Sequence, residues 1–195
     1  MRPPMPKTPP HIASLEPYRP GKPISELQRE LGRDDIIKLA SNENPIGPSP
    51  KSIAAIIAAV HDLHRYPDGG LPLIQKIAKM HTIKPENVVI SNGSDSLILA
   101  VTRAYVSFGG EIVTSEGSFA QYDLMPRAQG ATIKLAPLKD YHYDLDAIAK
   151  LVTPKTQVVF LANPNNPTGT LFTRTEWDAF YKKIQASIFG YNLRN

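Results

Sequence analysis

The chain has 195 residues, a formal net charge of +4, 42% hydrophobic residues and 21% charged residues. These values suit a globular chain built around one large domain, and they exclude intrinsic disorder. No cysteine is present, which excludes disulfides, thiolate metal sites and cysteine nucleophiles.

The distribution of charge and apolar residues limits the possible partners. The 22 Lys and Arg are scattered among 18 Asp and Glu without a basic run, which argues against nucleic acid and suits a small anionic ligand. The longest apolar stretch, Ile53–Val60, is far shorter than the roughly 18 residues of a membrane span. Met1–Lys7 lacks the apolar core of a signal peptide. We therefore expect a cytoplasmic protein with no membrane partner.

Helix-like and strand-like stretches alternate along the chain after a proline-rich beginning. Residues 1–10 predict an extended or flexible arm. Helical periodicity then predicts helices over Lys51–Leu63, Leu71–Met80, Leu97–Val106, Tyr122–Arg127, Leu145–Leu151 and Thr175–Ile184. Short β-rich runs predict strands at Val88–Ile90, Ile112–Thr114, Thr132–Leu135 and Val158–Leu161. This alternation predicts an α/β fold with a mainly parallel sheet flanked by helices, its strands buried on both faces.

Several polar residues stand where a helix is expected to begin or end. Ser49 and Thr173 precede predicted helices and suit the capping position, and the pair Asp144 and Asp146 suits the start of Leu145–Leu151. The i,i+3 pair His61 and His64 lies at a helix end, where interaction with the last carbonyls is expected rather than metal binding. No metal site is predicted.

The loop Ser91–Ser96 lies between a predicted buried strand and a long helix. Gly93 permits an unusual backbone angle, and Ser94 or Asp95 can cap the helix that follows. Free N–H groups and the positive end of the helix dipole would meet at the carboxyl edge of a parallel sheet, an arrangement that binds phosphate. Capping of a purely structural helix is the alternative for the same residues.

The segment Asn163–Gly169 follows the strand predicted at Val158–Leu161. Its two prolines and its glycine force a sharp turn at the end of that strand. An Asn–Pro bond here is a candidate for the cis form. A surface turn is the alternative, but the position after a core strand favours a site residue.

These segments, taken with others in order, resemble a known family. LASNENPIGPSP (Leu39–Pro50), YPDGG (66–70), SNGSDS (91–96), SFAQY (118–122) and NPNNPTG (163–169) are similar in order and spacing to the class I/II aminotransferases of fold type I. The stretch 12–23 resembles the histidinol-phosphate aminotransferases in particular, and the likeness runs from about residue 10 to 184.

The resemblance implies a pyridoxal 5'-phosphate cofactor and a role for each matching residue. Gly93, Ser94 and Asp95 would hold the cofactor phosphate, Phe119 would lie against the pyridine ring, and Asn166 would donate to the 3-oxygen of that ring. The resemblance further implies that Tyr66 reaches the cofactor phosphate of a neighbouring subunit. It places Asn42, Glu43 and Asn44 near the substrate. Phe119 as plain core and Tyr66 as a helix-end anchor are the alternatives.

The resemblance also implies residues that have no counterpart in the sequence. The family's aspartate at the pyridine nitrogen, its Schiff-base lysine and its substrate-carboxylate arginine all come later than the matched motifs. Lys182 and Lys183 lie before the expected position of that lysine. We therefore expect no catalytic residue in this chain, which would be an N-terminal, catalytically incomplete portion. The expected segments are an arm and small-domain piece (1–35), a truncated cofactor-binding large domain (36–184) and a non-family tail (185–195).

The activity implied by the resemblance is transfer of an amino group between L-histidinol phosphate and 2-oxoglutarate in histidine biosynthesis, by a homodimer. Two alternatives stay open at this point. One is a non-catalytic remnant that binds phosphate ligands or a partner chain. The other is a relative that acts on aromatic amino acids or decarboxylates threonine phosphate.

Overall fold

The computed structural model describes residues 7–18 and 20–188, and the structural statements below refer to these residues. The chain forms two compact units, the first made of residues 1–16 and 89–195 and the second of residues 17–88. Each unit is described by itself. The segment bounds expected from the sequence (1–35, 36–184 and 185–195) stay a prediction.

A three-stranded parallel sheet forms the centre of the first unit. Its strands are β1 (Glu111–Ser115), β2 (Thr132–Ala136) and β5 (Thr156–Val159), in the order β2-β1-β5. β1 pairs with β2 in an unbroken register, and an irregularity after Glu111 interrupts its register with β5. β1 is buried along most of its length. A strand buried on both faces has a continuous rather than an alternating apolar pattern, and this pattern predicted the strand correctly.

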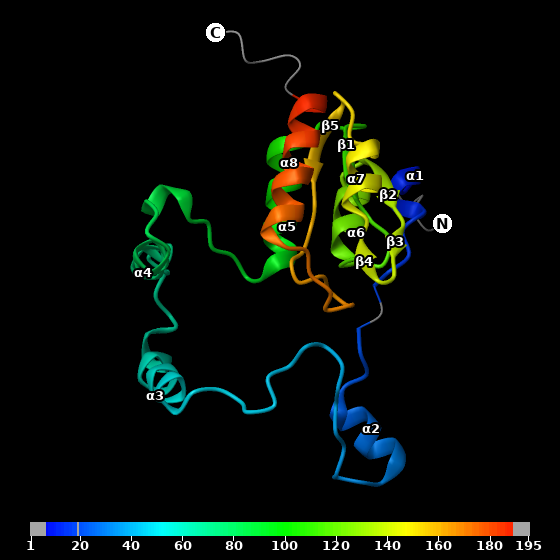
Figure 1. Ribbon diagram of the computed structural model, residues 1–195. Coiled ribbons are helices and arrows are strands. Elements are labelled where there is room, and N and C mark those ends of the chain that lie inside the picture. The colour runs from blue at the N-terminus through cyan, green and yellow to red at the C-terminus, as the bar shows by residue number, and fades with distance from the viewer. Residues whose placement is uncertain (1–6, 19, 189–195) are drawn as a thin grey trace, which may run out of the picture. The chain divides into compact units, whose positions relative to one another are not determined.

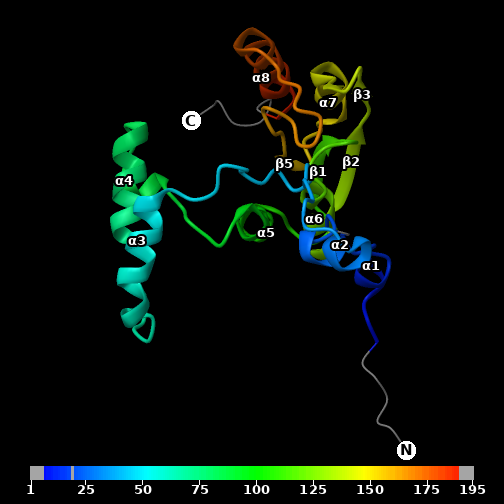
Figure 2. The same ribbon diagram turned by 90° about the horizontal axis from the view of Figure 1, so that it is seen from below.

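Helices cover both faces of this sheet (Figure 2). On one face lie α7 (Leu145–Leu151), which contacts β1 and β2, and α8 (Arg174–Ile188), which packs against α7. On the other lie α5 (Ser94–Tyr105) and α6 (Gln121–Ala128), which pack on each other. The short helix α1 (Pro10–Ala13) contacts α6. The predicted α/β architecture is confirmed.

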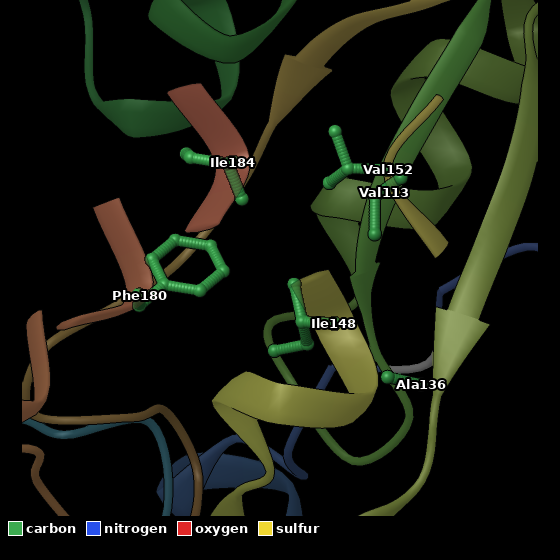
Figure 3. Packing of buried hydrophobic residues seen from close by; sticks show 6 residues of the cluster. All are labelled: Val113, Ala136, Ile148, Val152, Phe180 and Ile184. Atoms are coloured by element: carbon green, nitrogen blue, oxygen red, sulfur yellow. The ribbon is translucent and has the colours of Figure 1, made fainter. Parts of the chain in front are cut away.

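The main hydrophobic core lies between the sheet and the pair α7 and α8 (Figure 3). It consists of side chains from both strands and helices, all nearly or fully buried: Val113, Ala136, Ile148, Val152, Phe180 and Ile184. Trp177 packs against its rim and stacks on Phe172 with ring centroids 6.0 Å apart. Burial of these apolar groups is the main stabilising contribution to this unit.

The second unit contains helices joined by turns. It comprises α2 (Ile24–Leu31), α3 (Pro50–Ala59), a 3₁₀ turn (Val60–Asp62), α4 (Leu71–His81) and a second 3₁₀ turn (Pro85–Asn87). Ala78 is the one fully buried residue among those described in this unit. Ile56 and Ile57 on α3 are about two-thirds exposed, at 64% and 65%. This unit therefore lacks a core of its own among the described residues.

Most predicted helices are confirmed to within a few residues of their expected bounds, and so are the caps at Ser49, Asp144 and Thr173. Ser49 accepts the N–H of Lys51 at 3.3 Å, and Asp144 accepts the N–H of Ala147 at 2.8 Å. Thr173 and Glu176 form a reciprocal capping box at the start of α8. Asp146, the other acid proposed for a cap, instead forms an ion pair with Lys183. His64 contacts the carbonyl oxygen of His61, as expected of a residue at a helix end.

Some predictions of local structure were wrong. Val88–Ile90 is not a strand, because a strand needs a hydrogen-bonded neighbour and this segment has none among the described residues. The antiparallel pair β3 (Leu138–Lys139) and β4 (His142–Tyr143) was missed, as were the helices α1 and α2. The two residues of the turn between β3 and β4, Asp140 and Tyr141, both have positive φ. Asp-Tyr is not the usual Asn-Gly or Asp-Gly signal of such a turn, which is why the pair was missed.

No helix among the described residues is long and apolar enough to cross a membrane. In the same residues, no group of three or more His, Asp or Glu side chains is placed to hold a metal ion.

A half-buried ion pair stabilises the amino edge of the sheet. Lys134 lies 2.8 Å from Glu111, which also accepts the hydroxyl of Thr153 at 2.6 Å. The hydrogen bond from Lys134, followed by that from Thr153, lowers the pKa of Glu111 below its ordinary value. Because its folded-state pKa is the lower one, Glu111 stabilises the fold fully above about pH 4.3, the ordinary glutamate value.

We therefore expect the melting temperature of the first unit to fall as the pH drops from 5 through the folded-state pKa of Glu111. Glu111→Gln should be less stable than the wild type at pH 7 and should show a smaller acid-induced loss. Asp35→Asn, which removes an exposed pair with Arg33, is the matched control and should leave the pH profile of this unit unchanged. Identical acid profiles for wild type and Glu111→Gln would contradict this assignment.

Candidate functional site

The turn before α5 exposes main-chain donors. Gly93 is the N-cap residue, with φ 109° and ψ 174°, and no side chain caps the helix among the described residues. This differs from the expectation that Ser94 or Asp95 would cap it, because the helix begins at Ser94 and both residues lie in its first turn. The first N–H groups of α5 consequently have no intrahelical or side-chain acceptor, and they suit an anion.

The geometry at Gly93 explains why this position is glycine. Its combination of φ and ψ belongs to a region of backbone space open essentially to glycine alone. A Cβ atom at this position would meet no atom within 4 Å, so the space beside the turn is open. The constraint is therefore backbone conformation, and the open space leaves the donors of α5 accessible from this side.

The loop after β1 carries Phe119, which is half-buried within a group of aromatic rings. Its ring meets Tyr122 edge-on at 5.6 Å, and Tyr122 stacks on Phe160 at 5.0 Å with nearly parallel planes. Burial, and to a lesser extent Tyr143, raises the pKa of the Tyr122 phenol, which keeps it neutral. The rings of Tyr122 and Phe160 therefore restrict the position of Phe119.

The loop after β5 carries the segment 163–169. Both of its Asn–Pro bonds are cis, as the sequence suggested for one of them. Asn165 is buried, at 3% exposure, whereas Asn166 is half-buried. No hydrogen bond joins the Asn166 carboxamide to another described residue, so its polar atoms are available to a ligand.

These three segments meet at one edge of the first unit. β1 and β5 are parallel neighbours, so the loops that follow them leave the sheet at the same edge. Figure 1 shows the beginning of α5 and the loop after β5 at this same end of the sheet. The structure thus places Gly93, Ser94, Asp95, Phe119 and Asn166 at the carboxyl edge of the parallel strands.

The remaining predicted site residues belong to the second unit. Tyr66 is 97% exposed. Asn42 has a positive φ, Glu43 pairs with Lys38 at 2.5 Å, and the Asn44 carboxamide is hydrogen-bonded within its own turn to Gly47 and Ile46. Their assignment to a neighbouring cofactor or to the substrate stays a prediction.

Sequence reasoning missed two residues at the carboxyl edge. Tyr143, on the unpredicted strand β4, contacts the loops after β1 and after β5 through its hydroxyl. Asn165 stands within a motif already singled out, but its neighbour Asn166 was chosen instead. The Oδ1 atom of Asn165 is buried and has no hydrogen-bond donor among the described residues. Burial was the property that distinguished the two asparagines, and the sequence alone does not show it.

Comparison with known proteins bears on this arrangement. Residues 34–189 match the family model of aminotransferase class I and II. The chain belongs to this family. Histidinol-phosphate aminotransferases are among its relatives: that of Anaeromyxobacter sp. (strain Fw109-5) is 49% identical over 182 residues, and one of Hydrogenovibrio crunogenus is 46% identical over 180. These alignments cover 92% of this chain, and the chain spans about half the length of the curated relatives it matches (50% and 48%).

A solved structure agrees with the family membership. The histidinol-phosphate aminotransferase of Sinorhizobium meliloti, crystallised in complex with pyridoxal-5'-phosphate, superposes with a TM-score of 0.79 at 28% sequence identity. The match covers 93% of this aminotransferase chain and 49% of the solved one. The fold is that of the fold-type-I aminotransferases, as predicted from the motifs.

Proposed function

We propose that this chain provides the cofactor-phosphate and ring-binding loops of a pyridoxal-phosphate-dependent histidinol-phosphate aminotransferase. The whole protein would transfer an amino group between L-histidinol phosphate and 2-oxoglutarate, as a cytoplasmic homodimer. One observation carries the proposal. An uncapped helix start, an aromatic side chain and an asparagine whose carboxamide has no hydrogen-bond partner among the described residues lie together at one sheet edge. The names of the histidinol-phosphate aminotransferase relatives support the substrate.

The residues at this edge fit pyridoxal phosphate. The cofactor carries a phosphate, an aromatic ring and a polar ring oxygen. The N–H groups at the start of α5 suit the phosphate, because the anion satisfies donors that lack acceptors and meets the positive end of the helix dipole. Phe119 offers an aromatic face, and the Asn166 carboxamide offers a free donor.

Each side chain would contribute positioning and electrostatics. When bound, the cofactor supplies an electron sink for chemistry at the substrate's α-carbon. The α5 N–H groups would fix one end of the cofactor and Phe119 would limit the tilt of its ring. A hydrogen bond from Asn166 would stabilise negative charge at the ring oxygen. We expect the remainder of the whole protein to supply the proton-transferring lysine, the aspartate at the ring nitrogen and the carboxylate-binding arginine, since the chain spans about half the length of its relatives.

A chimera tests this function directly. Residues 34–189 would replace the matching segment of the Anaeromyxobacter sp. aminotransferase, which is 49% identical over the aligned region. We expect the chimera to restore growth without histidine to an auxotroph that lacks this transaminase, since the replaced segment is proposed to hold the same cofactor in the same way. The 195-residue chain expressed alone is expected to leave the strain dependent on histidine.

Two controls make this experiment decisive. The chimera carrying Gly93→Val should not restore growth, although circular dichroism should show it folded. A folded wild-type chimera that leaves the auxotroph dependent on histidine would contradict the proposal, as would growth supported by the 195-residue chain alone.

A further inference from the structure

The two loops that carry Phe119 and Asn166 need a fixed separation to act on one ring, and the sheet alone does not provide it. The described pairing of β1 with β5 extends only to Val113 and Val159. One more main-chain hydrogen bond follows, from Phe160 N–H to the carbonyl of Val113 at 3.0 Å. Beyond it, the distance between the two loops depends on side chains.

Besides a bond at the strand ends from the Thr114 hydroxyl to the Phe160 carbonyl at 2.9 Å, the hydroxyl of Tyr143 makes the first link between the loops themselves. It lies 2.6 Å from the hydroxyl of Ser118, next to Phe119, and it accepts the N–H of Ala162 at 3.3 Å. Tyr143 is itself held by the β3–β4 pairing, opposite Leu138. One atom of a third element therefore contacts both loops.

The carboxamide of Asn165 makes the second link. Its Nδ2 donates to the carbonyl of Gly117 at 3.2 Å and to the hydroxyl of Thr168 at 2.9 Å. Its own main chain is fixed by an N–H donated to Thr170 and a carbonyl that accepts from Gly169, both at 2.8 Å. Because Asn165 is buried, water does not compete freely for these bonds.

We infer that Tyr143 and Asn165 are positioning residues, which hold Phe119 and Asn166 at the separation that a bound pyridine ring requires. The inference rests on the proposed function. Each link joins the immediate sequence neighbour of a ligand-facing residue, Ser118 beside Phe119 and Asn165 beside Asn166. Neither link involves the turn at Gly93, so phosphate binding and ring binding have separate structural supports.

The test compares two probes, inorganic phosphate and pyridoxal phosphate, titrated into the 195-residue chain and followed by NMR of the amides of residues 93–96. Tyr143→Phe removes one oxygen atom and both of its hydrogen bonds. We expect its affinity for inorganic phosphate to stay within about twofold of the wild type, while its affinity for pyridoxal phosphate falls about five- to tenfold, the effect of losing one neutral hydrogen bond. Tyr141→Phe, at an exposed ring two residues away, is the matched control and should change neither affinity.

A purely structural role would not separate the two probes. Equal weakening of both ligands in Tyr143→Phe, or no change in either, would overturn the inference. If Tyr143→Phe fails to fold, Ser118→Ala removes the same link from the other side, and the same ratio of affinities decides.

The failure of the proposed function has a different signature. If the wild-type chain binds pyridoxal phosphate no more tightly than inorganic phosphate, the cofactor assignment is wrong whatever the variants do. The link between the loops is then tested by hydrogen exchange at the Ala162 amide. This exchange should be about five- to tenfold faster in Tyr143→Phe. Unchanged exchange there would show that the hydroxyl does not hold the loops.

Discussion

Replacing Gly93 by valine should abolish binding of inorganic phosphate and pyridoxal phosphate. Gly93 has φ 109° and ψ 174°, a conformation open essentially to glycine, and a β-branched residue there stores about 1–3 kcal/mol of strain. The turn would relieve this strain by rotating, and the first N–H groups of α5 would then point in other directions. A loss of this size lowers affinity about five- to 150-fold, which takes a weak anion site toward or below the limit of detection.

NMR titration measures this loss at the residues concerned. In the wild type, saturating ligand should shift the amides of residues 93–96 more than those of the Lys51–Leu63 segment, and in Gly93→Val the two sets should move alike. Gly109→Val is the matched control, because Gly109 also has a positive φ (78°) and open space around it, in the loop before β1. It should keep the shifts at residues 93–96. If Gly93→Val retains them as well, the turn is only a helix start.

Ser94 provides a smaller comparison at the same turn. Because it lies in the first turn of α5 and is not the cap, Ser94→Ala should not weaken the helix. Any reduction in phosphate affinity, about fivefold for one neutral hydrogen bond, would then come from the hydroxyl's contact with the anion.

Truncation of Ile148 to alanine should cause the largest loss of stability in the first unit. Ile148 is fully buried on α7 and belongs to the core cluster with Val113 and Phe180 (Figure 3). Removing its outer carbons loses the free energy gained by burying them and leaves a cavity. Together these two effects lower the free energy of unfolding by about 2–5 kcal/mol. That is a large share of the 5–15 kcal/mol that typically separates folded from unfolded chains.

Urea denaturation followed by the fluorescence of Trp177 measures this effect, since Trp177 is the single tryptophan and packs against the core. Leu171→Ala is the matched control: Leu171 is 58% exposed in the same unit, and its truncation should change the free energy of unfolding by less than about 0.5 kcal/mol. Similar midpoints for Ile148→Ala and the wild type would show that α7 is not packed on this sheet.

The features predictable from the sequence are those that local patterns determine. Apolar runs located β1, β2 and β5 because buried parallel strands are apolar on both faces, and the side chains of Ser49, Thr173 and Asp144 marked helix starts. Val88–Ile90 has a composition as strand-like as that of β1, yet it forms no ladder. Strand formation depends on a neighbour, and composition does not reveal one.

The candidate site was predictable where a motif constrains the backbone. Gly93 and the Asn–Pro bonds were identified because glycine and proline restrict the chain locally. Tyr143 was missed because its role depends on a two-residue turn with an unusual sequence, and Asn165 because burial separates it from Asn166. Links between distant segments depend on tertiary packing, which no local pattern encodes.

The two edges of the sheet differ in what their side chains do. At the amino edge, Glu111 pairs with Lys134, and Gln157 accepts the N–H and the hydroxyl of Ser107. The opposite edge carries the loops that are proposed to hold the cofactor. We therefore expect substitutions at the amino edge to change the temperature at which the chain unfolds without changing the affinity of the proposed cofactor site. We expect homologues adapted to different temperatures to differ in sequence first at the amino edge. Substitutions in the loops beyond β1 and β5 should occur in both loops together.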